Sequence, residues 1–244
     1  MKKMMLLASF VYLILAAGCK KENTSNDDDP QDQDPAANPC RLVKSTRYNF
    51  NDNIYKYDAQ KRLIRFESGN RVITFSYNGN VINIVGTNNG ATSYTRTVEL
   101  NEHGLATSVH TVSTSQGWYK ETFVYDGPRL IKRSYSDQNA TNTSVVTYEW
   151  QNGNLVKEID SNDEILYEYD LSKPARPADY LHRRQFELGY RTISSKNRVK
   201  KITNYSGVYT IEHFENNDGN ITAFSVNVPG NGDDYQIQNF YECD

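Results

Sequence analysis

The sequence has little of what most catalytic and metal sites require. Its 244 residues include only 3 cysteines, 4 histidines and 2 tryptophans. No two histidines have the i,i+4 spacing of a zinc-binding helix, and no Gly-x-Ser-x-Gly motif is present. We therefore expect a protein that is not an enzyme and that holds no metal or other cofactor.

Charge of one sign and long apolar runs are also lacking. The formal net charge is −3, and no basic cluster exceeds a few residues, so nothing indicates a nucleic-acid partner. The main apolar run, Met4–Ala17, follows Lys2 and Lys3 and is shorter than the about 20 residues needed to span a bilayer. A basic start, an apolar centre and small residues at the end are typical of a secretory signal.

A short motif closes this apolar run. Leu15-Ala16-Ala17-Gly18-Cys19 resembles the lipobox of bacterial lipoproteins. The resemblance implies that residues 1–18 are a signal peptide removed before Cys19, and that Cys19 carries a lipid on its sulfur and its new amino group. The expected location is the cell envelope, with the protein anchored to the outer membrane through that lipid.

Residues 19–39 are polar, contain three prolines and show no apolar periodicity, so we expect a flexible tether. Acidic residues soon after a lipidated cysteine resemble a surface-export signal of the Bacteroidetes. Here Lys20-Lys21 comes first and the acidic run begins only at Asp27. The surface and periplasmic faces of the membrane therefore both stay open.

Two further cysteines, Cys40 and Cys243, lie at the two ends of the remaining chain. In an oxidising compartment two such thiols can form a disulfide, and the alternative is that both stay unpaired. A bridge would close a loop of about 200 residues, for which the chain-entropy model gives about 5 kcal/mol.

From Arg41 onward the sequence repeats. An alternating stretch ends in an aromatic or large apolar residue, a polar turn follows, and a second apolar stretch begins. The residues that end the first stretch recur every 20 to 25 positions, at Tyr57, Tyr77, Leu100, Tyr125 and Trp150. This period corresponds to one β-hairpin plus its connection to the next.

The strands of these hairpins alternate with period two. Tyr119, Phe123 and Tyr125 fall on one face of their strand, opposite Lys120 and Thr122. Asn-Gly and Asp-Gly pairs supply the tight turns. We therefore predict an all-β fold for residues 40–244, a single domain of roughly 12–16 antiparallel strands. This meander should curl into an open or nearly closed barrel-like sheet, and a disulfide at its ends favours the nearly closed form.

One segment interrupts the repeat. Pro177 could open a helix and Gly189 could close it, and Leu181, Gln185 and Leu188 have helical spacing. We predict one short helix or irregular insert near residues 177–188 that covers part of the concave face.

The order of these features resembles a known family. Tyr57-Asp58, Tyr125-Asp126 and Tyr169-Asp170 are similar to the Tyr-Asp repeats of bacterial surface and toxin shells. The lipobox, the early Cys40-Arg41-Leu42, the hairpins and the later segment 195–203 together resemble a Bacteroidetes lipoprotein family of unknown function, described as having a porin-like fold. That family brings no known catalytic residues.

The strands show no continuous lipid-facing apolar band, so we expect a soluble domain on a lipid tether rather than an inserted barrel. Its expected function is to bind a ligand, possibly a glycan, or a protein partner on the curved sheet. Trp118 and Trp150 are the candidates for stacking on a ligand, with simple packing as the alternative. A carrier of a lipid or apolar molecule and an unrecognised hydrolase are the other hypotheses.

Overall fold

The computed structural model describes residues 40–47, 50–139, 143–161, 163–176, 178–228 and 234–243. The predicted signal peptide, the tether, Cys19 and Pro177 lie outside these residues. Within the described ranges, no helix is both long and apolar enough to cross a bilayer.

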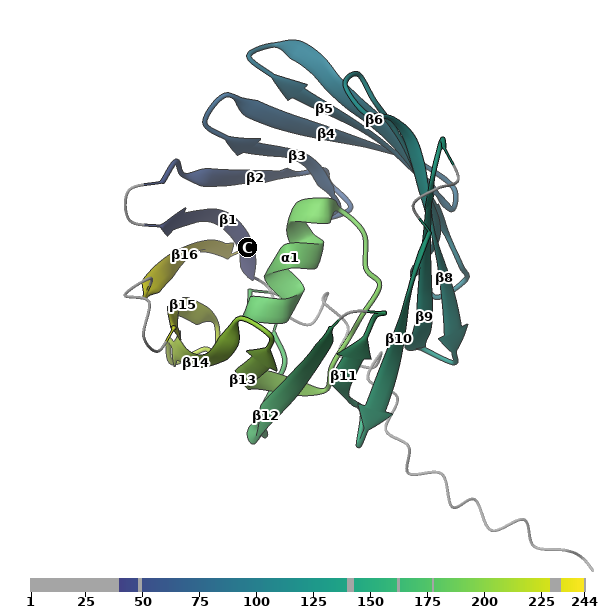
Figure 1. Ribbon diagram of the computed structural model, residues 1–244. Coiled ribbons are helices and arrows are strands. Elements are labelled where there is room, and N and C mark those ends of the chain that lie inside the picture. Colours follow the sequence, from purple (N-terminus) through teal and green to yellow (C-terminus); the bar gives the residue numbers. More distant parts are fainter. Residues whose placement is uncertain are drawn as a thin grey trace, which may run out of the picture.

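The described strands form one antiparallel sheet in which each strand pairs with the next and the last pairs with the first, so the sheet is a closed barrel (Figure 1). The strands are β1 (Cys40–Arg47), β2 (Asn53–Tyr57), β3 (Leu63–Ser68), β4 (Arg71–Asn78), β5 (Val81–Asn88), β6 (Ala91–Leu100), β7 (Ala106–Ser113), β8 (Gly117–Asp126), β9 (Arg129–Asp137), β10 (Ser144–Gln151), β11 (Asn154–Ile159), β12 (Glu164–Pro174), β13 (Asn197–Asn204), β14 (Gly207–Glu215), β15 (Ile221–Asn227) and β16 (Tyr235–Cys243). The predicted all-β meander of hairpins is confirmed, and the sheet closes completely.

The tight turns follow from the Asn-Gly pairs. Asn89 and Gly90, between β5 and β6, have φ values of 50° and 79°. Asn152 and Gly153, between β10 and β11, have φ values of 52° and 77°. Two successive residues with positive φ form the turn whose twist matches two antiparallel strands, so each pair sets the register of its hairpin.

The two faces of the sheet differ in the way that the alternation predicts. Phe123, Tyr148 and Tyr169 are buried on the inner face of their strands. On the outer face, Glu168 of β12 lies opposite Lys201 of β13, and their side chains form an ion pair of 2.7 Å. Aromatic side chains therefore contribute much of the inner face at these strands, and the outer face is mixed and partly charged.

One end of the barrel is packed. There, a repeated contact links neighbouring hairpins, because a tyrosine hydroxyl or the tryptophan N–H donates to a backbone carbonyl of an earlier strand at 2.6 to 2.9 Å. The donor and acceptor pairs are Tyr57 and Leu42, Tyr77 and Leu63, Tyr125 and Ala106, Trp150 and Leu130, Tyr169 and Leu155, and Tyr241 and Ile221. The acceptor residues have 0 to 7% of their surface exposed. The sequence repeat thus encodes a series of buried contacts around this end, which we call the packed end.

The barrel closes between its first and last strands. Cys40 of β1 lies directly opposite Cys243 of β16, and the two form a disulfide across a sequence separation of 203. Both cysteines lie at the packed end, because β1 starts there and β16 finishes there.

The predicted insert is a helix, α1 (Tyr180–Leu188), that lies inside the barrel (Figure 1). Gly189 ends it with a φ of 75°. The segment that returns to β13 is fixed at the packed end, where Ala106 N–H donates to the carbonyl of Arg191 and Lys196 N–H donates to that of Gly153. The helix therefore enters the lumen from the packed end and returns to it.

Candidate functional site

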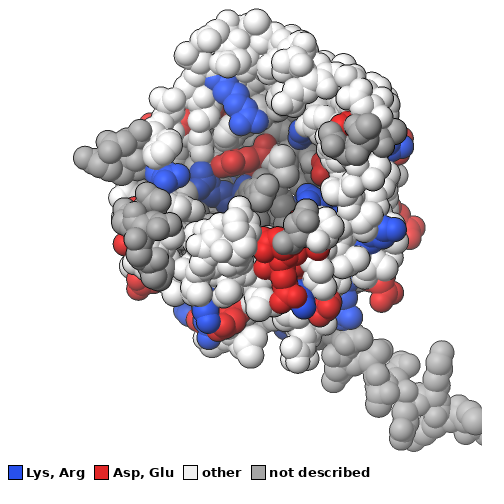
Figure 2. Space-filling model, in the orientation of Figure 1, with Lys and Arg blue, Asp and Glu red and all other residues white. Residues whose placement is uncertain are grey.

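The lumen keeps a cavity beside α1, because a barrel of this many strands encloses more space than its side chains fill. This large cavity has a volume of about 670 Å³. Among its lining residues are four at the end of the barrel opposite the disulfide, Asp160, Asp163, Asn204 and Tyr235. We call this the open end. Figure 2 shows the hollow there, with charged side chains gathered inside it.

Charged side chains line the large cavity, and four of them form two ion pairs. Arg183 and Glu187 of α1 form an ion pair of 3.0 Å, one helical turn apart. On the sheet, Arg133 lies 3.6 Å from Glu121. These pairs keep charges in the lumen without leaving them isolated from a partner.

Tyrosines supply much of the remaining surface of the large cavity. The Tyr167 hydroxyl donates to Glu158 at 2.6 Å. Burial raises the pKa of Tyr190 to about 12, and it raises the pKa of Tyr235 to about 12 as well. Both phenols are therefore neutral at physiological pH and can donate a hydrogen bond while a ring face contacts a ligand.

A second, small cavity of about 260 Å³ adjoins the first. Its polar and aromatic lining residues include Arg71, Tyr94, Arg96, Thr111 and Tyr119. Arg96, Glu187 and Leu188 line both cavities, so the two spaces meet beside the C-terminal half of α1.

Buried polar contacts at the start of α1 fix the helix in the lumen. Asp179 caps it, because its carboxylate accepts from the backbone N–H of His182 at 2.9 Å. The same carboxylate lies 2.9 Å from His182 Nδ1. Burial alone would raise the pKa of Asp179, but the His182 ring and the backbone donors lower it. Burial alone would lower the pKa of His182, but Asp179 raises it, which favours a charged pair.

The other end of α1 is held by Gln185. Its side-chain amide donates to the carbonyl of Ile193 at 2.6 Å and accepts from the N–H of Thr192 at 2.9 Å. These bonds tie the helix to the segment that follows it. Arg183 and Glu187 are consequently presented to the cavity from a fixed backbone.

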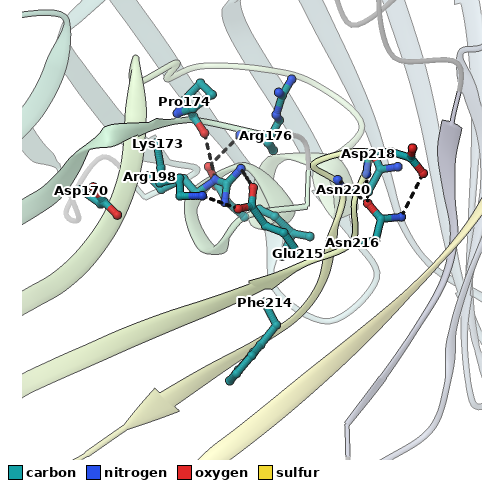
Figure 3. A network of polar contacts seen from close by, with 12 residues as sticks. Asp170, Lys173, Pro174, Arg176, Arg198, Phe214, Glu215, Asn216, Asp218 and Asn220 are labelled. Carbon is teal, nitrogen blue, oxygen red and sulfur yellow. Dashed lines mark hydrogen bonds and ion pairs between the residues drawn. The ribbon is translucent and has the colours of Figure 1, made fainter.

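A further polar network lies at the packed end, outside both cavities (Figure 3). Arg198, which is almost fully buried, binds Glu215 at 2.5 Å and donates to the carbonyl of Pro174 at 2.9 Å. Lys173 binds the other carboxylate oxygen of Glu215 at 2.7 Å. Hydrogen bonds and charge from Arg198 and Lys173 lower the pKa of Glu215 to about 2. The network fastens the end of β12 to β13 and β14, so its role is structural.

The nearby turn from Asn216 to Asn220 is also held by its own side chains. The side-chain oxygen Oδ1 of Asn216 accepts from the N–H of Asp218 at 3.1 Å and from that of Asn220 at 3.0 Å (Figure 3). Such bonds form a compact turn. Across the described ranges, no group of three or more His, Cys, Asp and Glu side chains is arranged to hold a metal ion.

Comparison with known proteins identifies the architecture. No protein-family model matches the chain, and no curated protein matches its sequence. Among solved structures, a porin-like protein from Bacteroides uniformis ATCC 8492 is similar with a TM-score of 0.58 and 15% identity, over 82% of this chain and 96% of that one. A porin-like protein from Bacteroides vulgatus ATCC 8482 is similar with a TM-score of 0.57 and 15% identity, over 82% of this chain and 98% of that one.

The protein has a porin-like fold. This agrees with the fold implied by the family resemblance of the sequence. At such identities the likeness establishes the fold and not the activity, so the function has to be argued from the lumen of the porin-like barrel.

The two tryptophans predicted to stack on a ligand lie in different environments. Trp118 of β8 is 41% exposed, on the outer face of the porin-like barrel, with its ring centroid 5.9 Å from that of His110. Trp150 of β10 faces inward at the packed end, where its N–H is bonded to Leu130. Neither lines the large or the small cavity. Their stacking on a ligand stays a prediction.

Sequence reasoning missed the lumen residues themselves. Arg96 stands on the same strand face as Tyr94 and Val98, so an arginine on an apolar face was visible in the alternation of β6. Arg183 and Glu187 show the i,i+4 spacing of an ion pair within the predicted helix. These signals pointed to charged groups inside the barrel.

Proposed function

We propose that this protein is a lipid-anchored protein of the cell envelope, without catalytic activity, that binds a small polar ligand in the open end of its barrel. The observation that carries the ligand proposal is the large cavity of about 670 Å³, which opens away from the disulfide and combines tyrosines with paired charges. Cavities of roughly 300–1,000 Å³ that mix aromatic surface with a few polar groups are typical of small-molecule sites.

The position of the chain ends supports the orientation. Cys40, the first described residue, lies at the packed end, and the predicted tether from Cys19 precedes it. A protein anchored through Cys19 would therefore be attached through its packed end, which leaves the open end free of the attachment. A ligand could then reach the cavity from the surrounding solution.

The lining also argues for a polar rather than an apolar ligand. A lipid carrier would place acyl chains against the walls of the cavity. Here these walls include Arg133, Glu121, Arg183 and Glu187, and covering such groups with hydrocarbon would remove water from them without replacing its hydrogen bonds. A small glycan, which has hydroxyl groups and apolar ring faces, suits this lining better.

Blocking the cavity tests the ligand site. Ile165 of β12 lines the large cavity, and its neighbour Leu166 is 41% exposed on the outer face. In a glycan array followed by calorimetric titration of each hit, Ile165→Trp should abolish binding and Leu166→Trp should retain it. Binding that survives Ile165→Trp, or native mass spectrometry that shows a co-purified lipid instead, would contradict the proposal.

Removing the lipidation site tests the anchor. Cys19→Ala should release the protein from membranes into the soluble fraction of cells, while Cys243→Ser should leave it attached. Protease treatment of intact cells then separates the surface from the periplasmic face. A Cys19→Ala protein that stays with the membrane would refute lipid anchoring.

A further inference from the structure

The small cavity carries an excess of positive charge. Arg71 and Arg96 line it, and Glu187 is its single acidic lining residue within the described ranges. Glu187 already forms an ion pair with Arg183 and accepts a hydrogen bond from Asn53 at 3.4 Å. Its charge is therefore engaged elsewhere, and the arginines determine the electrostatics of this space.

Arg96 is held in place by neutral groups. Its Nε donates to Thr111 Oγ1 at 2.9 Å, and one of its terminal nitrogens donates to the Tyr119 hydroxyl at 3.3 Å. The centre of its guanidinium lies 5.3 Å from the ring centroid of Tyr94. These contacts use two of the five N–H donors of a guanidinium and orient it, but none of them supplies a negative charge.

The two other arginines that line the large cavity differ from Arg96. Arg133 is paired with Glu121 and Arg183 with Glu187, whereas no carboxylate of the described residues lies within ion-pair distance of Arg96. Half-burying a cation without an anionic partner costs free energy, and an anion bound from solution would offset part of that cost. Arginine is also the side chain whose planar fork best matches a carboxylate or another oxyanion.

The sequence builds this arrangement from a glycine. Gly86 of β5 lies opposite Tyr94 of β6, and a Cβ added to Gly86 would lie 2.0 Å from Cε1 of the Tyr94 ring. Only glycine lets the ring lie flat against the strand at this point. The ring then forms a wall of the small cavity next to Arg96.

We propose that the small cavity binds the negatively charged group of an acidic sugar, a carboxylate or a sulfate, through an ion pair with Arg96. This inference rests on the proposed function and names the class of its ligand. A volume of about 260 Å³, hydroxyl groups from Thr111 and Ser113 and the rings of Tyr94 and Tyr119 fit a compact group with hydroxyls and an apolar face. The rest of the ligand extends past Arg96 into the large cavity.

Matched probes test the charge requirement. Calorimetric titration compares digalacturonate, its neutral methyl ester and a sulfated galactose disaccharide. The wild-type protein should bind at least one of the two acidic probes about tenfold or more tightly than the ester, and this preference should shrink as salt is added. The acidic probe with the higher affinity identifies the anionic group, a carboxylate or a sulfate. Equal affinity for the ester and both acids, or no binding of either acid, overturns the proposal.

Matched variants test the residue. Arg96→Gln should lower the affinity for the acidic probe by about tenfold or more, and it should lower the weak affinity for the uncharged ester much less. Arg96→Lys, which keeps the charge, should restore part of the loss. The control is Arg65→Gln, which removes an outer-face charge paired with Glu67 and should have no effect. Unchanged binding in Arg96→Gln overturns the proposal.

Two further variants test the same cavity by blocking it, and they keep the test valid if Arg96→Gln fails to fold. Ser113 lines the small cavity, and its neighbour Val112 is 46% exposed on the outer face. Ser113→Trp should remove binding of the acidic probe, and Val112→Trp should not. If neutral glycans bind and Ile165→Trp blocks them while Ser113→Trp and Arg96→Gln change nothing, the proposed function stands and the acidic-sugar inference fails.

Discussion

Removing the Cys40–Cys243 disulfide should destabilise the protein through its unfolded state. The bridge spans a sequence separation of 203, almost the whole barrel. In the chain-entropy model, a constraint on a loop of this length stabilises the folded state by about 5 kcal/mol. In the folded state, pairing of β1 with β16 continues from Cys40 to Arg47, so the barrel stays closed without the sulfur–sulfur bond. The effect therefore arises because the unfolded chain gains freedom.

Urea denaturation of the Cys40→Ser/Cys243→Ser variant measures this effect, with Cys19→Ala in every protein compared so that no other thiol is present. The unfolding free energy should fall by up to about 5 kcal/mol, and the dependence on urea should steepen because the unlinked chain exposes more surface. Each single serine variant should behave like the double variant. A loss of stability with an unchanged urea dependence would place the effect in the folded barrel and refute the reasoning.

Three further predictions concern single side chains. Gly189→Ala should lower the free energy of unfolding in urea by about 1–3 kcal/mol more than Gly79→Ala does. Both glycines have positive φ, but a Cβ at Gly189 would lie 2.1 Å from the Phe75 ring, whereas nothing lies within 4 Å of a Cβ at Gly79. Equal losses of stability would contradict the close approach of Phe75. Tyr169→Phe should lower the free energy of unfolding by about 1–3 kcal/mol, because it removes hydrogen bonds of 2.6 and 3.0 Å from a buried hydroxyl. A variant as stable as the wild type in thermal unfolding would refute a stabilising role for the repeated hydroxyl contact. Glu215→Gln should lower stability at neutral pH. Its difference from the wild type should shrink as pH falls from 4.5, the ordinary pKa of a glutamate, to about 2, because the folded state keeps this carboxylate charged over that range. A difference that is constant from pH 7 to 2 would argue against the lowered pKa.

The strand order could be predicted from the sequence because the pairing is local. Each strand between β1 and β16 pairs with the next strand along the chain. Tyr57, Tyr77, Tyr125 and Trp150 mark the ends of hairpins in the sequence, and in the structure they donate the hydroxyl or N–H contacts of the packed end. A repeat detected as spacing thus corresponds to a repeated physical contact.

Closure and the lumen could not be predicted in the same way. Closure depends on two segments about 200 residues apart in sequence, and within the sequence only Cys40 and Cys243 indicate that the two lie together. The alternation places Arg96 on the inner face, but whether that face meets packed side chains or a cavity depends on the barrel width and the position of α1. Arg96 was therefore identifiable as inward and not as a ligand contact.

The arrangement of the two ends separates this barrel from a pore. A pore needs a continuous path, whereas here the buried layer that includes Leu63, Leu130, Leu155 and Ile221 crosses one end and the returning segment after α1 is bonded over it. In the proposed function, a ligand held in the open end is contacted by the paired charges and by Arg96, and these are the groups expected to set its selectivity. The packed end therefore supports the proposed function, in which the porin-like barrel holds a molecule rather than conducting one.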